Sequence, residues 1–411
     1  MSEKSPRFSP YAAVILILAL STALKATWAL NSAGSLDVVI FWKFGKFLRQ
    51  DSLKYMYETY SAFNHTPLTA MIVKTLCRMA DGHFFFFAAA LRFLSIFADI
   101  GLVLGLLHVK RVTGRPPWWA IGLFAISPVS LIISGFHGNM DPVMVMFMFF
   151  AGIAVLHGRP ALSGALLALA FNIKIVPIVL TPAFFFFWLA RGRREALLFT
   201  TTTVGGFLLG AAVPLIQCPS AYVAHVLCYS SVWGMWGVTY WVRETGLEMF
   251  HTLDFRNLSL EQTAIMASLK AILFGGTMTV SWLRRKAAPV ELFSTLGIIW
   301  TIVFVFAPGA VVQYMPWFAP FILMLTPRWW AALTAASTIF MVSYYHPAAE
   351  YRFPWDLAYP KIEESNPWSN LPWVIFIALL VHQIMRVRAE IRLHQTAPLI
   401  GTSPETETAA A

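Results

Sequence analysis

Long apolar stretches separated by short polar segments recur along the whole chain. A helix of about twenty apolar residues is long enough to cross a hydrocarbon core of about 30 Å. On this basis the sequence predicts twelve crossings, at residues 11–30, 84–108, 117–134, 142–157, 160–172, 175–190, 197–216, 264–283, 289–306, 311–326, 329–346 and 370–387. Several of these stretches are short, so we expect one or two pairs of crossings to be tilted, broken or re-entrant.

The polar segments between the crossings predict three outer loops. The first loop, at residues 31–83, is expected to carry two amphipathic helices, at 36–49 and 67–80. The second of these stretches is apolar but too short to span comfortably, and it contains Lys74 and Arg78. We therefore place it along the outer membrane surface rather than across the bilayer.

The other two outer loops are expected at residues 217–263 and 346–371. Aromatic and histidine side chains recur at helical spacing in the first of these, at Tyr222, His225, Tyr229, Trp233, Trp236 and Tyr240. An interfacial helix with its rings at headgroup level would explain the pattern. The alternative is that one ring stacks on the face of a sugar.

Composition narrows the class of protein. Hydrophobic residues make up 58% of the chain and charged residues 12%, and the mean hydropathy is +0.65, which excludes a soluble domain. We predict an all-α polytopic membrane protein of about twelve transmembrane helices, with one transmembrane domain at residues 11–387. The first apolar segment is too long for a removed signal peptide and has no small-residue cleavage site, so we expect a retained helix.

Basic residues gather on one side of this predicted topology. They are Lys4, Arg7, Lys110, Arg111, Arg115, Arg159, Arg191, Arg193, Arg194, Arg284, Arg285, Lys286, Arg328, Arg386, Arg388 and Arg392. Positive charge favours the cytoplasmic side of a membrane. We therefore predict a multi-pass protein of the inner (plasma) membrane, with a cytoplasmic N-terminus at 1–10, a cytoplasmic, partly disordered tail at 388–411, and outer loops in the periplasm. No basic run is dense enough to indicate nucleic-acid binding.

Familiar soluble-enzyme motifs are absent from the sequence. It contains no zinc-ligand spacing, phosphate-binding loop or serine nucleophile elbow, so we predict no metal ligands and no cofactor, with a divalent metal as the alternative left open. The three cysteines, Cys77, Cys218 and Cys228, do not form a disulfide framework. Cys218 and Cys228 would pair only in an oxidising compartment.

Polar and ionisable residues collect at the outer ends of the predicted helices. They are Asp37, His65, His137, Asn139, Asp141, Lys174, Gln313 and Tyr314. Structural explanations exist for several of them: Asp37 and Asp141 suit helix caps, His137 suits a hydrogen-bonded interfacial histidine, and Lys174 suits a lysine that extends toward the headgroups. The gathering of these groups on one side of the membrane favours a functional site.

Two further ionisable groups lie inside predicted crossings. Arg92 and Asp99 are seven residues apart and therefore share one helix face, which predicts a structural ion pair. Lys25 in the first crossing is expected to extend toward the headgroups.

The order of these motifs resembles the membrane-embedded glycosyltransferases of the GT-C fold. The resemblance is closest to the dolichyl-phosphate-glucose-dependent glucosyltransferases and their bacterial relatives, and it covers roughly residues 11–190. Residues 65–70 (His-Thr-Pro-Leu-Thr-Ala) resemble that branch's Tyr-Pro-Pro-Leu-Thr-Ala element, and Leu91-Arg92-Phe93 with Asp99 resembles its Met-Arg-x-x-Val…Asp helix. Residues 136–141 (Phe-His-Gly-Asn-Met-Asp) and 168–174 (Ala-Leu-Ala-Phe-Asn-Ile-Lys) resemble two further elements. In place of the family's late histidine element stands Val311-Val312-Gln313-Tyr314.

This resemblance implies that the chain moves a sugar from a polyprenyl-phosphate carrier to a lipid-linked or cell-envelope glycan acceptor. Asp37 is then the candidate general base. The candidate substrate-binding residues are His65, Arg92, His137, Asn139, Asp141, Lys174, Gln313 and Tyr314. Lys174, Arg92 or a histidine would stabilise the leaving phosphate without a metal, and direct displacement would invert the anomeric centre.

Two other interpretations of the sequence remain open. A multi-pass transporter of an anionic or lipid-linked substrate would also use intramembrane Lys25, Arg92 and Asp99. The ionisable groups gather at one end rather than at the midplane, however, and no repeat relates the two halves of the chain. A non-catalytic membrane scaffold would leave Asp37 replaceable.

Overall fold

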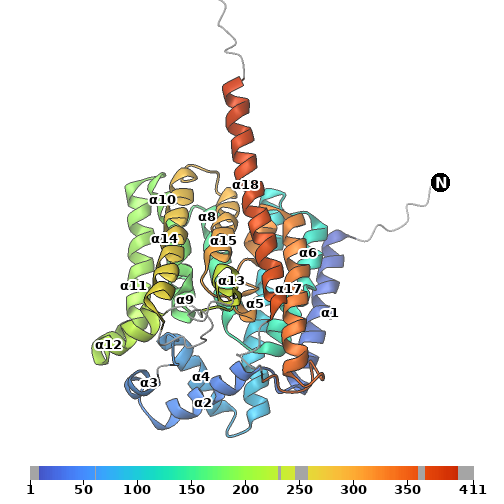
Figure 1. The fold of residues 1–411 in the computed structure, drawn as a ribbon, viewed down its shortest axis with the longest axis vertical. Coiled ribbons are helices and arrows are strands. Elements are labelled where there is room, and N and C mark those ends of the chain that lie inside the picture. The colour runs from blue at the N-terminus through green and yellow to red at the C-terminus, as the bar shows by residue number, and fades with distance from the viewer. Residues whose placement is uncertain (1–8, 61, 230–232, 246–257, 360–365, 397–411) are drawn as a thin grey trace, which may run out of the picture.

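The structure, a computed structural model, describes residues 9–60, 62–229, 233–245, 258–359 and 366–396. Helices, turns and loops make up this part of the chain, with one isolated parallel β-bridge between Ser35 and Ala358. Long helices run side by side along one axis, and a group of short helices covers one end of the bundle (Figure 1). The expected all-α class is confirmed for the described residues.

The first half of the chain forms the following elements: α1 (Pro10–Asn31), α2 (Leu36–Gln50), α3 (Leu53–Thr59), α4 (Pro67–Met79), α5 (Phe84–Thr113), α6 (Trp118–Ala125), α7 (Pro128–Ser130), η1 (Leu131–His137), α8 (Asp141–Leu156), α9 (Pro160–Ile173), η2 (Val176–Leu180), α10 (Thr181–Leu189) and α11 (Arg193–Gln217). Of these, η1 is a π-helix and η2 is a 3₁₀ helix.

The second half forms these elements: α12 (Pro219–Tyr222), η3 (Val223–Leu227), α13 (Gly237–Glu244), α14 (Leu260–Leu283), α15 (Glu291–Phe306), η5 (Val312–Tyr314), α16 (Ala319–Leu325), α17 (Pro327–Ala348), η6 (Pro367–Ser369) and α18 (Asn370–Thr396). Helix α18 continues past residue 387, where the last crossing was expected to end. The rest of the tail, 397–411, lies outside the described residues.

Six helices among the described residues are long and apolar enough to cross a membrane. They are Pro10–Asn31, Phe84–Thr113, Trp118–His137, Arg193–Gln217, Leu260–Leu283 and Pro367–Arg386. Four shorter apolar helices accompany them: Asp141–Leu156, Pro160–Ile173, Val176–Leu189 and Glu291–Phe306. The expected count of about twelve crossings is therefore not established by helix length, although every predicted range contains helical residues.

Short helices explain why fewer helices reach the length of a crossing than the sequence predicted. Helix α9 has 14 residues, which at 1.5 Å per residue gives about 21 Å, less than the hydrocarbon core. Proline stands at the start of α8, α9 and η2, where its missing N–H does no harm but where it ends the preceding helix. Apolar stretches of the sequence are thus divided among helices, each of which is too short to cross the hydrocarbon core by itself.

Helices α2, α3 and α4 lie together at one end of the bundle, opposite the end at which α1 begins and α18 terminates (Figure 1). Helix formation at 36–49 and 67–80 was expected, and α2 and α4 occupy these positions. Their placement at a membrane surface stays a prediction. Thr69 Oγ1 of α4 donates to the Ile173 carbonyl at 2.8 Å, and Thr66 donates to the Asn172 carbonyl, so α4 is tied to the end of α9.

The second outer loop differs from its predicted form. A single helix through Tyr222 and Tyr240 was expected, but π-helix η3 ends at Leu227 and the next described helix, α13, begins at Gly237. The rings of Tyr222 and Trp236 are fully buried in the protein rather than arranged as an exposed interfacial belt. Tertiary packing of large aromatic side chains has therefore overridden their helical spacing.

Buried ion pairing also differs from the sequence prediction. The pair expected between Arg92 and Asp99 is wrong: Asp99 Oδ2 accepts from Lys25 Nζ at 2.7 Å and from Ser130 Oγ at 2.6 Å. Lys25 is only 2% exposed, so it does not extend to the headgroups. The network joins α1, α5 and α7 inside the bundle.

Arg92 instead holds the end of α1 against α5. Its guanidinium donates to the Ser32 hydroxyl at 2.7 Å, to the Ser32 carbonyl at 2.8 Å and to the Ala88 carbonyl at 2.9 Å, and the side chain is completely buried. This fixes the chain immediately before Gly34, whose φ of +86° starts the turn into α2. The three cysteines are free thiols, so Cys218 and Cys228 are not bridged.

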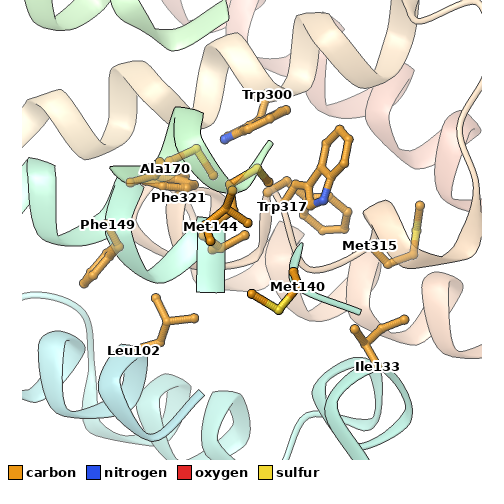
Figure 2. Close-up of a cluster of buried hydrophobic side chains, with 14 of the residues drawn as sticks. Leu102, Ile133, Met140, Met144, Phe149, Ala170, Trp300, Met315, Trp317 and Phe321 are labelled. Atoms are coloured by element: carbon orange, nitrogen blue, oxygen red, sulfur yellow. The ribbon is translucent and has the colours of Figure 1, made fainter. Parts of the chain in front are cut away.

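One large apolar core runs through the described part of the bundle, and it includes a tightly packed group around Met144. Trp317, Trp300 and Phe321 surround Met144 in this cluster (Figure 2). The rings of Trp300 and Trp317 lie 5.8 Å apart, and Trp317 is 4% exposed. Dense packing of this kind holds the indole of Trp317 in one position. Its N–H is thereby aimed at Asp141, to which it donates a hydrogen bond.

Candidate active site

Asp37 stands in the first turn of α2. Ser35 is the N-cap of this helix, and its hydroxyl accepts from the Asp37 N–H at 3.2 Å while donating to the His137 carbonyl at 2.8 Å. The interpretation of Asp37 as a helix cap is therefore wrong. Its carboxylate is left for other contacts.

One oxygen of the Asp37 carboxylate receives two donors from the turn that follows η1. His137 Nε2 lies 3.1 Å and Asn139 Nδ2 lies 3.0 Å from Asp37 Oδ2. Oδ1 takes no hydrogen bond from the described residues. The side chain is 28% exposed, so the carboxylate is not closed off by the protein, and Oδ1 keeps its lone pairs for a further donor.

The surroundings of Asp37 favour its ionised form. Burial by itself raises the pKa of a carboxyl group, but the neighbouring His137, the charge of Lys174 and the hydrogen bond of Asn139 outweigh it, so the pKa of Asp37 lies below its ordinary value. Asp37 is therefore a carboxylate at neutral pH, which is the form that can accept a proton.

Lys174 and Asp141 form the second half of the site. Lys174 Nζ lies 3.0 Å from Asp141 Oδ1 and 3.2 Å from Oδ2, and Trp317 Nε1 donates to Oδ2 at 2.9 Å. Asp141 is 1% exposed and Lys174 14% exposed. Asp141 is therefore not a helix cap, and Lys174 does not extend toward the headgroups. Each is instead the buried ion-pair partner of the other.

Two aromatic rings complete the surroundings of Lys174. Its Nζ lies 4.9 Å from the centroid of Tyr314 and 4.9 Å from that of Trp317, and the two rings are stacked 3.9 Å apart. An ammonium over an aromatic face is stabilised electrostatically. Of the three N–H bonds of Lys174, two serve Asp141, which leaves one for a ligand.

Asn139 connects the two halves of the site. Its Nδ2 donates to Asp37, while its Oδ1 accepts from the Asp141 N–H at 3.1 Å. Its own carbonyl accepts from Ser95 of α5. The turn reaches this geometry at Gly138, whose φ is +78°, and a Cβ added there would stand 2.5 Å from Val38.

His65 lies at the edge of the same site. Its ring packs 4.9 Å from Phe41, and its backbone carbonyl accepts from the Tyr57 hydroxyl at 2.7 Å. Burial, together with the charge of Lys174, lowers the pKa of His65 to about 3 against the opposing effect of Asp37. The imidazole is therefore neutral at physiological pH and acts as a polar, uncharged neighbour.

The remaining candidates are placed differently. Gln313 stands in η5 beside Tyr314, but none of the hydrogen bonds among the described residues connects its side chain to the site. Arg92 lies behind Gly138, and three of its N–H groups donate to Ser32 and Ala88, which favours a structural role over substrate contact.

Two residues of the site had no signal in the sequence. Trp317 binds Asp141, as described above, and Tyr345 of α17 has its hydroxyl 2.6 Å from His137 Nδ1. Both lie in apolar stretches for which the sequence predicted only membrane crossings. Across the described residues, no group of three or more His, Cys, Asp or Glu side chains is arranged to hold a metal ion.

A cavity of about 660 Å³ adjoins Lys174. It lies between α9, η2, α11, α14 and the end of α15, and Tyr314 and Trp317 form part of its wall. Most of the wall is apolar, including Phe171, Ile178, Val179, Val204, Phe207, Leu273, Phe274, Val303 and Phe304. We call this cavity the apolar groove. Lys270 also lines the apolar groove, and Lys174 is next to it through the rings of Tyr314 and Trp317, which contact Lys174 and form part of the wall.

Comparison with protein families then decides what kind of protein carries this site. The model for glycosyltransferase family 87 matches residues 63–308, which is more than half of the chain. The chain belongs to glycosyltransferase family 87. No curated protein matched it.

Family membership confirms that this chain is a membrane glycosyltransferase, which was expected from the GT-C resemblance. It does not support the dolichyl-phosphate-glucose branch specifically. The matched segment contains His65, His137, Asn139, Asp141 and Lys174 of the glycosyltransferase. Asp37, Tyr314, Trp317 and Tyr345 lie outside it, so their roles depend on the geometry.

Proposed function

We propose that this glycosyltransferase moves a hexose or another sugar from a polyprenyl-phosphate carrier to a hydroxyl group of a lipid-linked or cell-envelope glycan, on the outer face of the membrane. One observation carries the proposal. A carboxylate with one uncommitted oxygen, Asp37 Oδ1, stands in the same small site as a cation, Lys174, and the two rings that contact this cation, Tyr314 and Trp317, also line the apolar groove.

The groove suits the carrier lipid. Its volume of about 660 Å³ lies within the usual range of ligand pockets, and its wall is mostly aliphatic and aromatic. A polyprenyl chain in the groove would bring its phosphate toward Lys174, whose third N–H is free to donate to a phosphate oxygen. Asp141 and Trp317 would hold the lysine in place for this contact.

Sugar transfer at this site needs one proton acceptor. The acceptor hydroxyl gives its proton to Asp37 Oδ1 as its oxygen attacks the anomeric carbon. The bond between that carbon and the phosphate oxygen breaks, and the phosphate leaves with the electron pair. Attack from the side opposite the phosphate inverts the anomeric centre. Lys174 stabilises the charge that develops on the leaving phosphate, and Asp37 later releases its proton to water.

The outer face is supported by the position of the basic residues. The turn between α10 and α11 and the turn between α14 and α15 lie at the end of the bundle opposite α2 and α4 (Figure 1). By their positions in the sequence, Arg191 belongs to the first of these turns and Arg285 to the second. At that end, Arg191 donates to the Ala287 carbonyl at 2.8 Å, and Arg115 pairs with Glu291 at 2.7 Å. If this basic end is cytoplasmic, Asp37 faces the periplasm.

A donor panel tests the proposal. The purified glycosyltransferase in lipid nanodiscs is incubated with undecaprenyl phosphate carrying labelled mannose, glucose or arabinose, and with a lipid extract of bacterial membranes as acceptor. We expect label to enter the acceptor fraction from at least one donor. A transporter or a scaffold would leave every donor intact, and that result would overturn the proposal.

A further inference from the structure

Tyr345 contacts the far side of the His137 ring. Its hydroxyl lies 2.6 Å from His137 Nδ1, whereas Nε2 of the same ring faces Asp37. Tyr345 is 1% exposed, and its ring packs against Phe136 at 5.4 Å and Phe353 at 5.9 Å between centroids. The phenol is therefore held in one position by packing, with His137 Nδ1 as its hydrogen-bond partner.

The chain of contacts restricts the protons on His137. An ionised Asp37 accepts hydrogen bonds only, so Nε2 must carry a hydrogen. If His137 is neutral, Nδ1 then has a lone pair, which accepts the hydroxyl hydrogen of Tyr345. If His137 were an imidazolium, Nδ1 would also carry a hydrogen, and the buried Tyr345 hydroxyl would lose its acceptor. The neutral form is the one that satisfies every polar atom.

We propose that Tyr345 is a positioning residue for sugar transfer, which holds His137 neutral with its Nε2–H directed at Asp37. This inference rests on the proposed role of Asp37 as the general base. It gives the site three linked groups from α2, η1 and α17, in which the outermost residue never touches the substrate. The consequence is that Asp37 Oδ2 is always occupied and Oδ1 is always the oxygen offered to the acceptor.

The inference predicts a change in how Asp37 and His137 take up protons. Asp37 and His137 are hydrogen-bonded to each other, so the acid limb of the pH–rate profile reports the pair rather than either residue alone. The Tyr345 hydroxyl donates to the Nδ1 lone pair of His137. It therefore stabilises the form of the pair in which Nδ1 carries no proton. Without that hydrogen bond, the pair takes up its next proton at a higher pH.

No other titratable group near Asp37 and His137 would produce the same shift of the acid limb. Those that face it are Lys174, His65, Tyr314 and Tyr344; Asp141 lies behind Lys174, and Arg92 lies behind Gly138. Among these side-chain types only histidine ordinarily titrates between about pH 4 and 8. His65 is neutral throughout that range, since its pKa is about 3.

The test is the pH dependence of kcat/KM for the acceptor in the Tyr345→Phe variant of the full-length glycosyltransferase in nanodiscs. The probes are undecaprenyl phosphate bearing labelled hexose and the bacterial lipid extract. We expect the acid limb to move up by about 0.5–1 pH unit, which corresponds to the loss of one hydrogen bond. We also expect kcat to fall about two- to tenfold, with the KM for the donor unchanged.

Two further variants separate positioning from general damage. Tyr222→Phe removes another buried hydroxyl, one without a hydrogen-bond partner among the described residues, and should keep the wild-type acid limb. Tyr345→Phe added to His137→Gln should change nothing further, because Tyr345 acts through His137. If Tyr345→Phe does not fold, site-specific difluorotyrosine at position 345 keeps the ring and donates more strongly, so the acid limb should move to lower pH.

The outcomes distinguish this inference from the proposed function. If Asp37→Asn is inactive but Tyr345→Phe keeps the wild-type acid limb, only the role of Tyr345 is overturned. A shift to lower pH in Tyr345→Phe, or additive losses with His137→Gln, would overturn it as well. Full activity of Asp37→Asn would instead overturn the proposed function from which this inference starts.

Discussion

Lys174 Nζ lies 3.0 Å and 3.2 Å from the two carboxylate oxygens of Asp141, and together they form a buried ion pair between the end of α9 and the start of α8. The pair changes what a substitution at Lys174 would do. Removing the lysine also leaves a carboxylate that is 1% exposed and that, among the described residues, keeps Trp317 as its one side-chain donor. Stability and donor binding must therefore be measured separately.

Lys174→Ala is expected to raise the KM for the lipid-linked sugar donor about ten- to a hundredfold. The physical reason is the loss of one charge-assisted contact to phosphate, which costs about 1.5–3 kcal/mol. The same change should destabilise the protein by about 3–5 kcal/mol, since Asp141 loses its ion-pair partner. Donor KM and the thermal unfolding midpoint in detergent measure the two effects.

The double variant Lys174→Ala with Asp141→Asn is the matched control for this experiment. It removes the buried charge that Lys174→Ala leaves unpaired, so it should recover most of the lost stability. Donor binding should stay weak. A donor KM that returns to the wild-type value would mean that Lys174 serves the fold alone.

Asp37→Asn is expected to abolish sugar transfer while preserving expression, stability and donor binding. Asn keeps the size of the side chain, and its carbonyl oxygen can still accept from His137 and Asn139. It cannot take the acceptor's proton, and the loss of a general base typically costs about 10²- to 10⁴-fold in rate. Single-turnover transfer rates are the measurement.

Asp51→Asn provides the control for Asp37→Asn, because Asp51 is an exposed residue at the other end of the same helix, α2. It should transfer sugar at the wild-type rate. Retention of more than about a tenth of wild-type turnover by Asp37→Asn lies outside the range for a general base. In that case Asp37 would be withdrawn as the base.

Filling the apolar groove should discriminate donors by lipid length. Val204 lines the groove on α11, whereas Leu209 lies on the same helix, is 82% exposed and does not line it. Val204→Trp is expected to raise the KM for an undecaprenyl-phosphate donor and to affect a short-chain, water-soluble analogue much less. Leu209→Trp should behave as wild type with both donors. Equal effects of Val204→Trp on both donors would argue against a lipid in the groove.

Lys25→Met is expected to destabilise the protein by about 3–5 kcal/mol, because it leaves the buried Asp99 carboxylate without its cation. Adding Asp99→Asn should restore most of that loss, since Asn can still accept from Ser130. The unfolding midpoint in detergent reports both changes. A single variant as stable as wild type would show that the pair contributes little to the fold.

His65 should make the protein less stable in mild acid. Its folded pKa of about 3 lies below the ordinary histidine value of about 6.5, so the unfolded state binds more protons below that value. Stability is therefore complete above about pH 6.5 and falls as the pH is lowered, by about 1–2 kcal/mol at pH 5. His65→Gln should remove this part of the loss, whereas His83→Gln, at an exposed position, should not. Unfolding midpoints at pH 7 and pH 5 provide the comparison.

Much of the fold followed from local pattern. Apolar runs predicted an all-α membrane protein, and the alternation of polar and apolar residues predicted helices where α2 and α4 are found. Those features depend on residues close together in the chain. The prediction of one helix through the second outer loop was wrong for the same reason. The helical spacing of Tyr222 and Trp236 is a local pattern, whereas their burial against distant helices decided the structure.

The sequence by itself determined that Asp37, His137, Asn139, Asp141 and Lys174 belong to one end of the bundle, because consecutive helices alternate in direction and bring every second connection to the same end. It did not determine which of these side chains contact one another. Helical periodicity states which face a side chain occupies, but not which helix lies opposite.

Only the tertiary structure paired Asp99 with Lys25 instead of Arg92, and Lys174 with Asp141. It also brought Tyr345 to His137 across 208 residues of sequence, from a stretch whose composition indicated nothing more than a helix. Such partners are fixed by packing, since a buried polar group must find a hydrogen bond wherever the surrounding helices provide one. That requirement acts in space and leaves no periodic signal along the chain.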